Sequence, residues 1–171
     1  MRVLLVGMMG AGKTTVGREL SARTGWPYLD NDELVERATG HTAKQLLGLG
    51  VAELRRAESA ALGQALRVAP PLIAAIPAGV IADAGDRERL RGGGGLVVWL
   101  RAKIETLLDR LGNDIDRPWL RPDPETALRR LYAGRDRYYA EVADLTVDVD
   151  RQPPSTVVDR ILAALPAANR R

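Results

Sequence analysis

The sequence contains no cysteine among its 171 residues. This absence excludes disulfide bonds and thiolate metal sites, and it fits a reducing compartment. Long hydrophobic runs are missing too. The opening stretch MRVLLVG has only four consecutive apolar residues before glycine, far fewer than a signal sequence or a membrane span needs. We therefore expect a cytoplasmic protein with no membrane partner.

Charge of one sign is not concentrated anywhere along the chain. The formal net charge of +3 comes from 25 basic and 22 acidic residues, without the basic block that nucleic-acid binding would need. No long heptad pattern is evident either. We therefore expect a monomer with no nucleic-acid partner. Lysine is scarce, with only Lys13, Lys44 and Lys103, so a lysine inside a motif is not explained by a high lysine content.

Apolar patterning predicts an α/β fold in a single domain spanning residues 1–171. A hydrophobic content of 46% is enough for one buried core in a chain of this length. Short apolar runs typical of buried strands occur at residues 3–6, 27–30, 71–76, 96–100 and 145–149. Helical patterns lie at residues 13–23, 51–68, 103–111, 124–143 and after Ser155, a candidate N-cap. This alternation predicts a five-stranded parallel sheet with helices on both faces.

Two connections between these elements are rich in turn residues. Gly92 to Gly95 precede a predicted strand and are expected to form a surface turn. Residues 112–124, GNDIDRPWLRPDP, contain three prolines and mixed charges between two predicted helices. That composition suits a mobile lid better than a packed element.

The stretch GMMGAGKTT, residues 7–15, follows a predicted strand and precedes a predicted helix. It satisfies the pattern G-x-x-x-x-G-K-[ST], which in that context predicts a loop that binds the phosphates of a nucleotide. Backbone N–H groups and the helix N-terminus face the phosphates, the lysine reaches the β and γ phosphates, and the first threonine binds Mg²⁺. The expected ATP-binding residues of the loop are Gly10, Ala11, Gly12, Lys13, Thr14 and Thr15.

The phosphate loop alone leaves open whether the protein is a kinase, a GTPase or a motor. The sequence has no guanine-reading N-K-x-D motif. The apolar runs at 72–76 and 96–100 do not end in the acidic residue expected of a Walker B strand. The carboxylate on the magnesium side must therefore come from elsewhere in the chain.

Two carboxylates follow the second predicted strand in the stretch LDND, residues 29–32. Ligands of open α/β folds gather at the carboxyl ends of strands, and residues i and i+2 of an extended segment face the same side. Asp30 and Asp32 are therefore expected to face one site. One carboxylate could hold a magnesium-bound water while the other accepts a hydroxyl proton or hydrogen-bonds an acceptor diol. In our leading hypothesis, Thr14 and Asp30 hold Mg²⁺, and Asp32 positions or deprotonates the hydroxyl. The alternative is a solvated turn in which Asp32 is the N-cap of a helix ELVERA.

Nearly the whole chain resembles the shikimate kinase family. The first part, GMMGAGKTTVGRELSARTGWPYLDNDELVERATG, is similar to the family's phosphate loop, first helix and D-x-D strand end. Later stretches that resemble family elements are GVAELRRAES, RPWL and GRDRYYAEVAD. The resemblance implies a P-loop fold of the nucleoside-monophosphate-kinase type. It also implies an acceptor-binding region at residues 31–62 and a lid at residues 112–124.

The resemblance further implies ATP-dependent phosphoryl transfer to a hydroxyl of shikimate, with ATP and Mg²⁺ as cofactors. Lys13, Asp32 and Arg117 match catalytic residues, and Arg117 is the lid arginine that also meets the phosphates of ATP. Arg110 fits the arginine beside the adenine ring. Pro153 falls in the stretch that fits the adenine-binding loop.

On the acceptor side, the resemblance implies a site for a small carboxylic acid. Arg55 and Arg135 match the arginines that bind the acceptor's carboxylate, and Glu58 matches the acid that supports Arg55. Asp32 and Gly79 complete the implied substrate-binding residues. The chemistry is reasonable in itself, because a planar guanidinium pairs bidentately with a carboxylate and stays charged when desolvated.

The chain departs from the family pattern in two places. After the third predicted strand the family has three consecutive glycines, whereas this chain reads Pro77, Ala78 and Gly79. Val51 and Leu54 replace the glutamate and the aromatic residue of the family's G-E-x-x-F-R element. These changes leave two alternatives beside shikimate phosphorylation. One is a kinase of the same family that acts on a different small polyhydroxy carboxylic acid, and the other is a catalytically impaired nucleotide-binding homologue.

Overall fold

One parallel sheet organises the protein. The computed structural model describes residues 1–112 and 123–166, and within them five strands pair in parallel in the order β2-β3-β1-β4-β5. The strands are β1 Arg2–Val6, β2 Tyr28–Leu29, β3 Leu72–Ala75, β4 Gly95–Arg101 and β5 Leu145–Asp148. The sheet expected from the apolar runs is confirmed, with each strand end within one residue of its predicted position.

Strand β1 lies at the centre of the sheet, between β3 and β4. Val3, Leu4 and Leu5 of this strand are completely buried, and every residue of β3 is buried as well. A strand covered on both faces needs apolar side chains at consecutive positions rather than at alternate ones. Burial on both faces explains why the apolar runs of the sequence are continuous.

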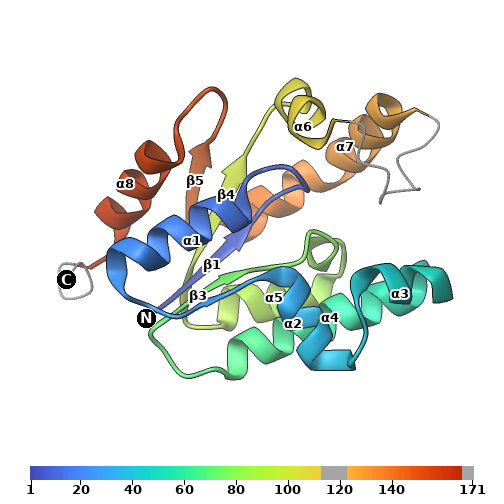
Figure 1. Cartoon of the computed structure of the whole chain (residues 1–171), viewed down its shortest axis with the longest axis horizontal. Helices are drawn as coiled ribbons and strands as arrows, with labels where there is room; N and C mark the ends of the chain where they lie inside the picture. The colour runs from blue at the N-terminus through green and yellow to red at the C-terminus, as the bar shows by residue number, and fades with distance from the viewer. Residues whose placement is uncertain (113–122, 167–171) are drawn as a thin grey trace.

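Helices cover both faces of the sheet (Figure 1). Helices α1 (Lys13–Thr24) and α8 (Pro154–Ala164) pack together on one face, and α4 (Val51–Arg67), α5 (Ala84–Gly92) and α7 (Pro124–Val142) cover the other. Right-handed crossovers place α1 on the opposite face from α4, α5 and α7, because the connection from β1 to β2 runs in the opposite direction to the three that follow. The other helical elements in the described ranges are α2 Asn31–Thr39, α3 Ala43–Leu49, the 3-10 turn η1 Val80–Ala82 and α6 Ile104–Leu111.

The structure differs from the sequence prediction in several local features. Helix α5 has no predicted counterpart, because its sequence AGDRERLRG contains a single large apolar residue, Leu90. Helix α8 begins at Pro154, so Ser155 is not its N-cap; proline is well suited to the first helical turn, where its missing N–H costs nothing. Gly92 to Gly95 do not form one turn, since Gly92 ends α5 and Gly95 begins β4.

Most of the predicted lid, with Arg117, lies outside the described residues. The chain is described again from Asp123, whose side chain accepts a hydrogen bond from the N–H of Thr126 at 3.1 Å and caps α7. In the part of the chain that is described, no helix is both long enough and apolar enough to span a membrane.

Candidate active site

The phosphate loop connects β1 to α1 at the centre of the sheet. Gly12 has a φ of 93°, in the left-handed region that favours glycine, and it directly precedes the first residue of α1. The N-terminal end of α1 therefore adjoins the loop, and helix N-termini attract anions. Lys13 is buried, and its Nζ donates to the carbonyl oxygens of Gly7 at 2.8 Å and Met8 at 3.2 Å. The ammonium group thus lies against the loop itself.

A cleft of about 660 Å³ borders this loop. Its walls include Lys13 and Thr14, Asp32 at the start of α2, Glu58 of α4, and Pro77 with Ala78 after β3. One cavity therefore brings residues of the predicted phosphate site together with residues of the predicted acceptor region.

A second cavity, of about 180 Å³, is lined by the phosphate loop, the first turn of α1, Arg110 of α6 and the segment at the start of α8. Arg110 donates to two carbonyl oxygens of the phosphate loop at 3.3 Å and to that of Val149 at 2.9 Å, so it links the loop to the end of β5. Gln152 and Pro154 line this cavity, whereas the predicted Pro153 between them does not.

Asp30 accepts hydrogen bonds from three directions. Its Oδ2 accepts from the hydroxyl of Thr14 at 2.9 Å and from that of Tyr28 at 2.7 Å. Its Oδ1 accepts from the N–H of Asp32 at 3.3 Å, which makes Asp30 the N-cap of α2. Burial acts to raise the pKa of Asp30, but the hydrogen bonds outweigh it and hold the pKa below its usual value. At neutral pH the group is therefore a carboxylate in contact with the Thr14 hydroxyl.

Asp32 does not lie in an extended segment. The prediction that Asp30 and Asp32 share one side of a strand is wrong, because α2 begins at Asn31 and Asp32 lies in its first turn. The alternative with Asp32 as the N-cap is also wrong, since Asp30 has that position. Asp32 is exposed, accepts from Nδ2 of Asn31 at 2.7 Å and lines the larger cleft. The two carboxylates therefore reach the site from a cap and from a helical turn.

Arg55 and Glu58, one turn apart on α4, form an ion pair. Glu58 is buried and lines the larger cleft. Gly79 packs directly against the pair, because a Cβ at this position would overlap the Arg55 guanidinium and the Glu58 carboxylate. The φ of Gly79 is −78°, which any residue can adopt, so glycine is required here for space and not for backbone freedom.

Arg135 and Tyr139, one turn apart on α7, both donate to the carbonyl oxygen of Ala78, at 3.2 Å and 3.3 Å. Burial lowers the pKa of Arg135 from its usual value; the nearby Arg55 cation lowers it further, while Tyr139 and Glu58 act in the opposite direction. Arginine nevertheless stays charged in proteins. Two neighbouring cations that share Glu58 as their carboxylate leave positive charge that a bound anion would balance.

The turn at Pro77 and Ala78 does not need the glycines of the family pattern. Neither residue has a positive φ, so the backbone is open to proline and alanine. What changes is the wall of the cleft. Pro77 offers no N–H, Ala78 adds a methyl group, and the Ala78 carbonyl already accepts from α7.

Sequence reasoning did not single out Tyr28 or Tyr139, although both contact predicted site residues. Tyr28 precedes Asp30 by two positions, and strand alternation puts such residues on the same side. Tyr139 follows Arg135 by one helical turn, and its ring stacks on Trp99 with centroids 5.6 Å apart. Each tyrosine could therefore have been found from its spacing to a predicted site residue, two positions along a strand or four along a helix.

Comparison with known proteins gives the family. The shikimate kinase family model matches residues 9–166. The chain belongs to the shikimate kinase family. A shikimate kinase of Thiobacillus denitrificans is 41% identical over 150 residues, which are 86% of this chain and 81% of the relative. The structure of the shikimate kinase from Acinetobacter baumannii in complex with shikimate has a TM-score of 0.87 at 37% identity, over 94% of this chain and 90% of that one.

The expected kinase fold is confirmed by more distant structures as well. A deoxyadenosine kinase from M. mycoides has a TM-score of 0.62 at 18% identity, over 95% of this chain and 97% of that one. A likeness at this identity concerns the fold alone. The P-loop fold with a parallel sheet flanked by helices is thus common to members of this family and to kinases outside it.

We expect Tyr28→Phe to raise the pKa of Asp30 toward its unperturbed value of about 3.9, because the substitution removes a hydrogen bond that favours the charged carboxylate. Titration of the carboxyl carbon by NMR measures this. Tyr138→Phe is the matched control, since the Tyr138 hydroxyl contacts Arg137 instead. An Asp30 pKa that is the same in Tyr28→Phe and in the wild type would contradict the expectation.

Proposed function

We propose that this protein transfers the γ-phosphoryl group of ATP to a hydroxyl of shikimate. The observation that carries the proposal is the cleft of about 660 Å³ that borders both the phosphate loop and the acceptor region with Asp32, Glu58 and Ala78. Membership of the shikimate kinase family and the likeness to a relative solved with shikimate support this choice of acceptor.

ATP would bind with its phosphates along the loop and its base in the smaller cavity. The loop N–H groups and the N-terminus of α1 favour phosphate oxygens, and Lys13 adds a cation at the same place. The cavity of about 180 Å³ beside Arg110 would take the adenine ring. Arg117 is proposed to meet the phosphates from the lid, and this role stays a prediction from the sequence.

Mg²⁺ would be held by Thr14 and Asp30. A hydroxyl and an anionic carboxylate are the oxygen ligands that suit this ion, and nucleotide sites add few protein ligands to the substrate phosphates. The hydrogen bond from Tyr28 keeps the carboxylate oriented toward Thr14. When bound, Mg²⁺ neutralises charge on the phosphoryl oxygens.

Asp32 is the proposed general base. Its carboxylate is exposed on the cleft that Lys13 and Thr14 also line. In the transfer, the acceptor oxygen bonds to the γ phosphorus, the bond from that phosphorus to the β–γ bridging oxygen breaks, and the hydroxyl proton passes to Asp32. ADP and the phosphate ester are the products.

Arg55 and Arg135 are the proposed carboxylate anchors. Each is attached to a group that lines the cleft, Arg55 to Glu58 and Arg135 to the Ala78 carbonyl. Two guanidinium groups that act on the one carboxylate of Glu58 favour an anionic acceptor over a neutral polyol. The carboxylate of shikimate supplies that anion.

A steady-state assay of ADP formation with ATP, Mg²⁺ and shikimate tests the function directly. We expect a rate that saturates with shikimate, and Asp32→Asn should lower it about 100-fold or more, because asparagine cannot take the proton. Glu33→Gln changes the adjacent exposed acid of the same helical turn and should have little effect. A wild-type rate that does not depend on shikimate would rule this function out.

Gly79→Ala should raise the KM for shikimate about 10-fold or more, because the added Cβ displaces the Arg55–Glu58 pair without straining the backbone. The KM for ATP should change little, since the phosphate loop is untouched. Gly134→Ala on α7, where an added Cβ meets nothing within 4 Å, is the matched control. An unchanged KM for shikimate in Gly79→Ala would remove the pair from the acceptor site.

A further inference from the structure

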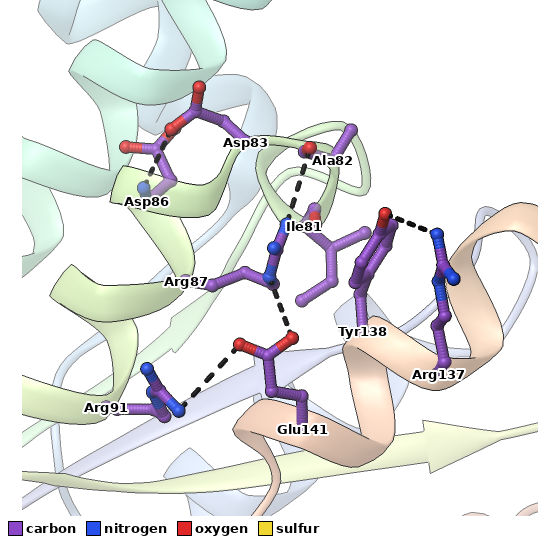
Figure 2. A network of polar contacts seen from close by, with 9 residues as sticks. All are labelled: Ile81, Ala82, Asp83, Asp86, Arg87, Arg91, Arg137, Tyr138 and Glu141. Atoms are coloured by element: carbon purple, nitrogen blue, oxygen red, sulfur yellow. Dashed lines mark hydrogen bonds and ion pairs between the residues drawn. The ribbon is translucent and has the colours of Figure 1, made fainter.

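Arg87 joins three elements next to the acceptor region. It is carried by α5, its side chain is 12% exposed, and it reaches both η1 and α7. Figure 2 shows Arg87 between the backbone of Ile81 and Ala82 on one side and Glu141 on the other. Its Nη1 donates to the carbonyl oxygens of Ile81 at 3.1 Å and Ala82 at 3.4 Å, and its Nε donates to Oε2 of Glu141 at 3.1 Å.

These bonds complete the turn at residues 77–82, whose first two residues, Pro77 and Ala78, line the acceptor cleft. The carbonyl groups of residues 77, 79 and 80 accept from N–H groups of residues 80, 82 and 83. The carbonyl of Ala78 accepts from the α7 side chains described above. Those of Ile81 and Ala82 accept from Arg87. Every carbonyl group of the turn is therefore bonded, and side chains of α5 and α7 supply what its own backbone does not.

Helix α7 is tied to Arg87 at two points. Glu141 receives the Nε bond, and the Arg87 guanidinium carbon lies 4.0 Å from the ring centroid of Tyr138. Tyr138 also receives a hydrogen bond from Arg137 at 2.8 Å (Figure 2). Tyr138 and Glu141 lie on the same helix as Arg135, within two turns of it. A helix is stiff over that length, so fixing this part of α7 also fixes the Cα of Arg135.

We infer that Arg87 is a positioning residue of the acceptor site. It holds the turn at residues 77–82 and helix α7 in one arrangement, so that Arg135 stays on the Ala78 carbonyl and presents its guanidinium to the acceptor's carboxylate. The inference rests on the proposed function, in which Arg135 binds that carboxylate. Arg87 lines neither of the two cavities and acts only through these partners.

Arg91, which also pairs with Glu141, provides a comparison for Arg87. It pairs with the other oxygen of the same Glu141, but at 3.8 Å and with a side chain that is 51% exposed. Exposed pairs of this kind contribute little, whereas shielded charge-assisted hydrogen bonds are about twice as strong as neutral ones. Removal of Arg87 leaves two carbonyl groups and a carboxylate without a strong partner. Removal of Arg91 leaves all three Arg87 hydrogen bonds in place.

The experiment compares Arg87→Met and Arg87→Lys with the matched control Arg91→Met. Arg87→Met should raise the KM for shikimate about 10-fold, with kcat and the KM for ATP within about 3-fold of wild type, because the acceptor arginine moves and the phosphate loop does not. Arg87→Lys keeps the charge but not the planar fork, so it should fall between wild type and Arg87→Met. Arg91→Met should match the wild type.

Hydrogen exchange supplies a readout that does not need activity. The N–H groups of Val80, Ala82 and Asp83 close the turn, and they should exchange faster in Arg87→Met than in Arg91→Met. If Arg87→Met does not fold, Arg87→Lys is judged by the same two measurements. The inference is overturned if the KM for shikimate, or the exchange of these amides, is the same as in Arg91→Met.

The order of measurement separates this inference from the function on which it rests. The wild-type chain is assayed with shikimate first. An inactive wild type contradicts the proposed function itself. An active wild type whose Arg87 variants match Arg91→Met contradicts only the positioning role.

Discussion

The pairing of β1 with β3 is the constraint on which the site depends. These strands are parallel neighbours in register from Arg2 with Leu72 to Leu5 with Ala75. Parallel strands end at the same edge of a sheet, so the phosphate loop after β1 and the turn after β3 must lie side by side. The connection from β1 runs toward β2, whereas the connection from β3 runs the opposite way, toward β4. The larger cleft lies at the ends of β1 and β3. The donor and acceptor halves are thus brought together by backbone geometry, before any site side chain is considered.

Side chains from two helices then give the acceptor half its charge. Arg55 on α4 and Arg135 on α7 approach the same turn, where Gly79 leaves room for one and the Ala78 carbonyl binds the other. Burying a cation is costly unless it is paired, and Glu58 pairs with Arg55 and also attracts Arg135, so one negative charge acts on two positive ones. The remaining positive charge is available to a carboxylate. The same turn therefore contacts both helices and also lines the acceptor site.

The sequence predicts the sheet and the phosphate loop well, because both depend on local patterns. It places Asp32 wrongly, since strand alternation and helix capping compete over three residues and the cap at Asp30 prevails. Helix α5 was missed because it buries little apolar surface. Arg87 was missed with it, because its partners are backbone carbonyl groups and a glutamate 54 positions away. Contacts of that kind leave no periodic signal in a single sequence.

The most direct measurement compares shikimate with its methyl ester as phosphoryl acceptors. If Arg55 and Arg135 bind the carboxylate, kcat/KM should be about 100-fold higher for the acid, because the ester keeps the hydroxyl groups but loses charged hydrogen bonds worth about 1.5–3 kcal/mol each. The KM for ATP should be the same with both acceptors. Equal kcat/KM values for the acid and the ester would contradict an acceptor site built around a carboxylate.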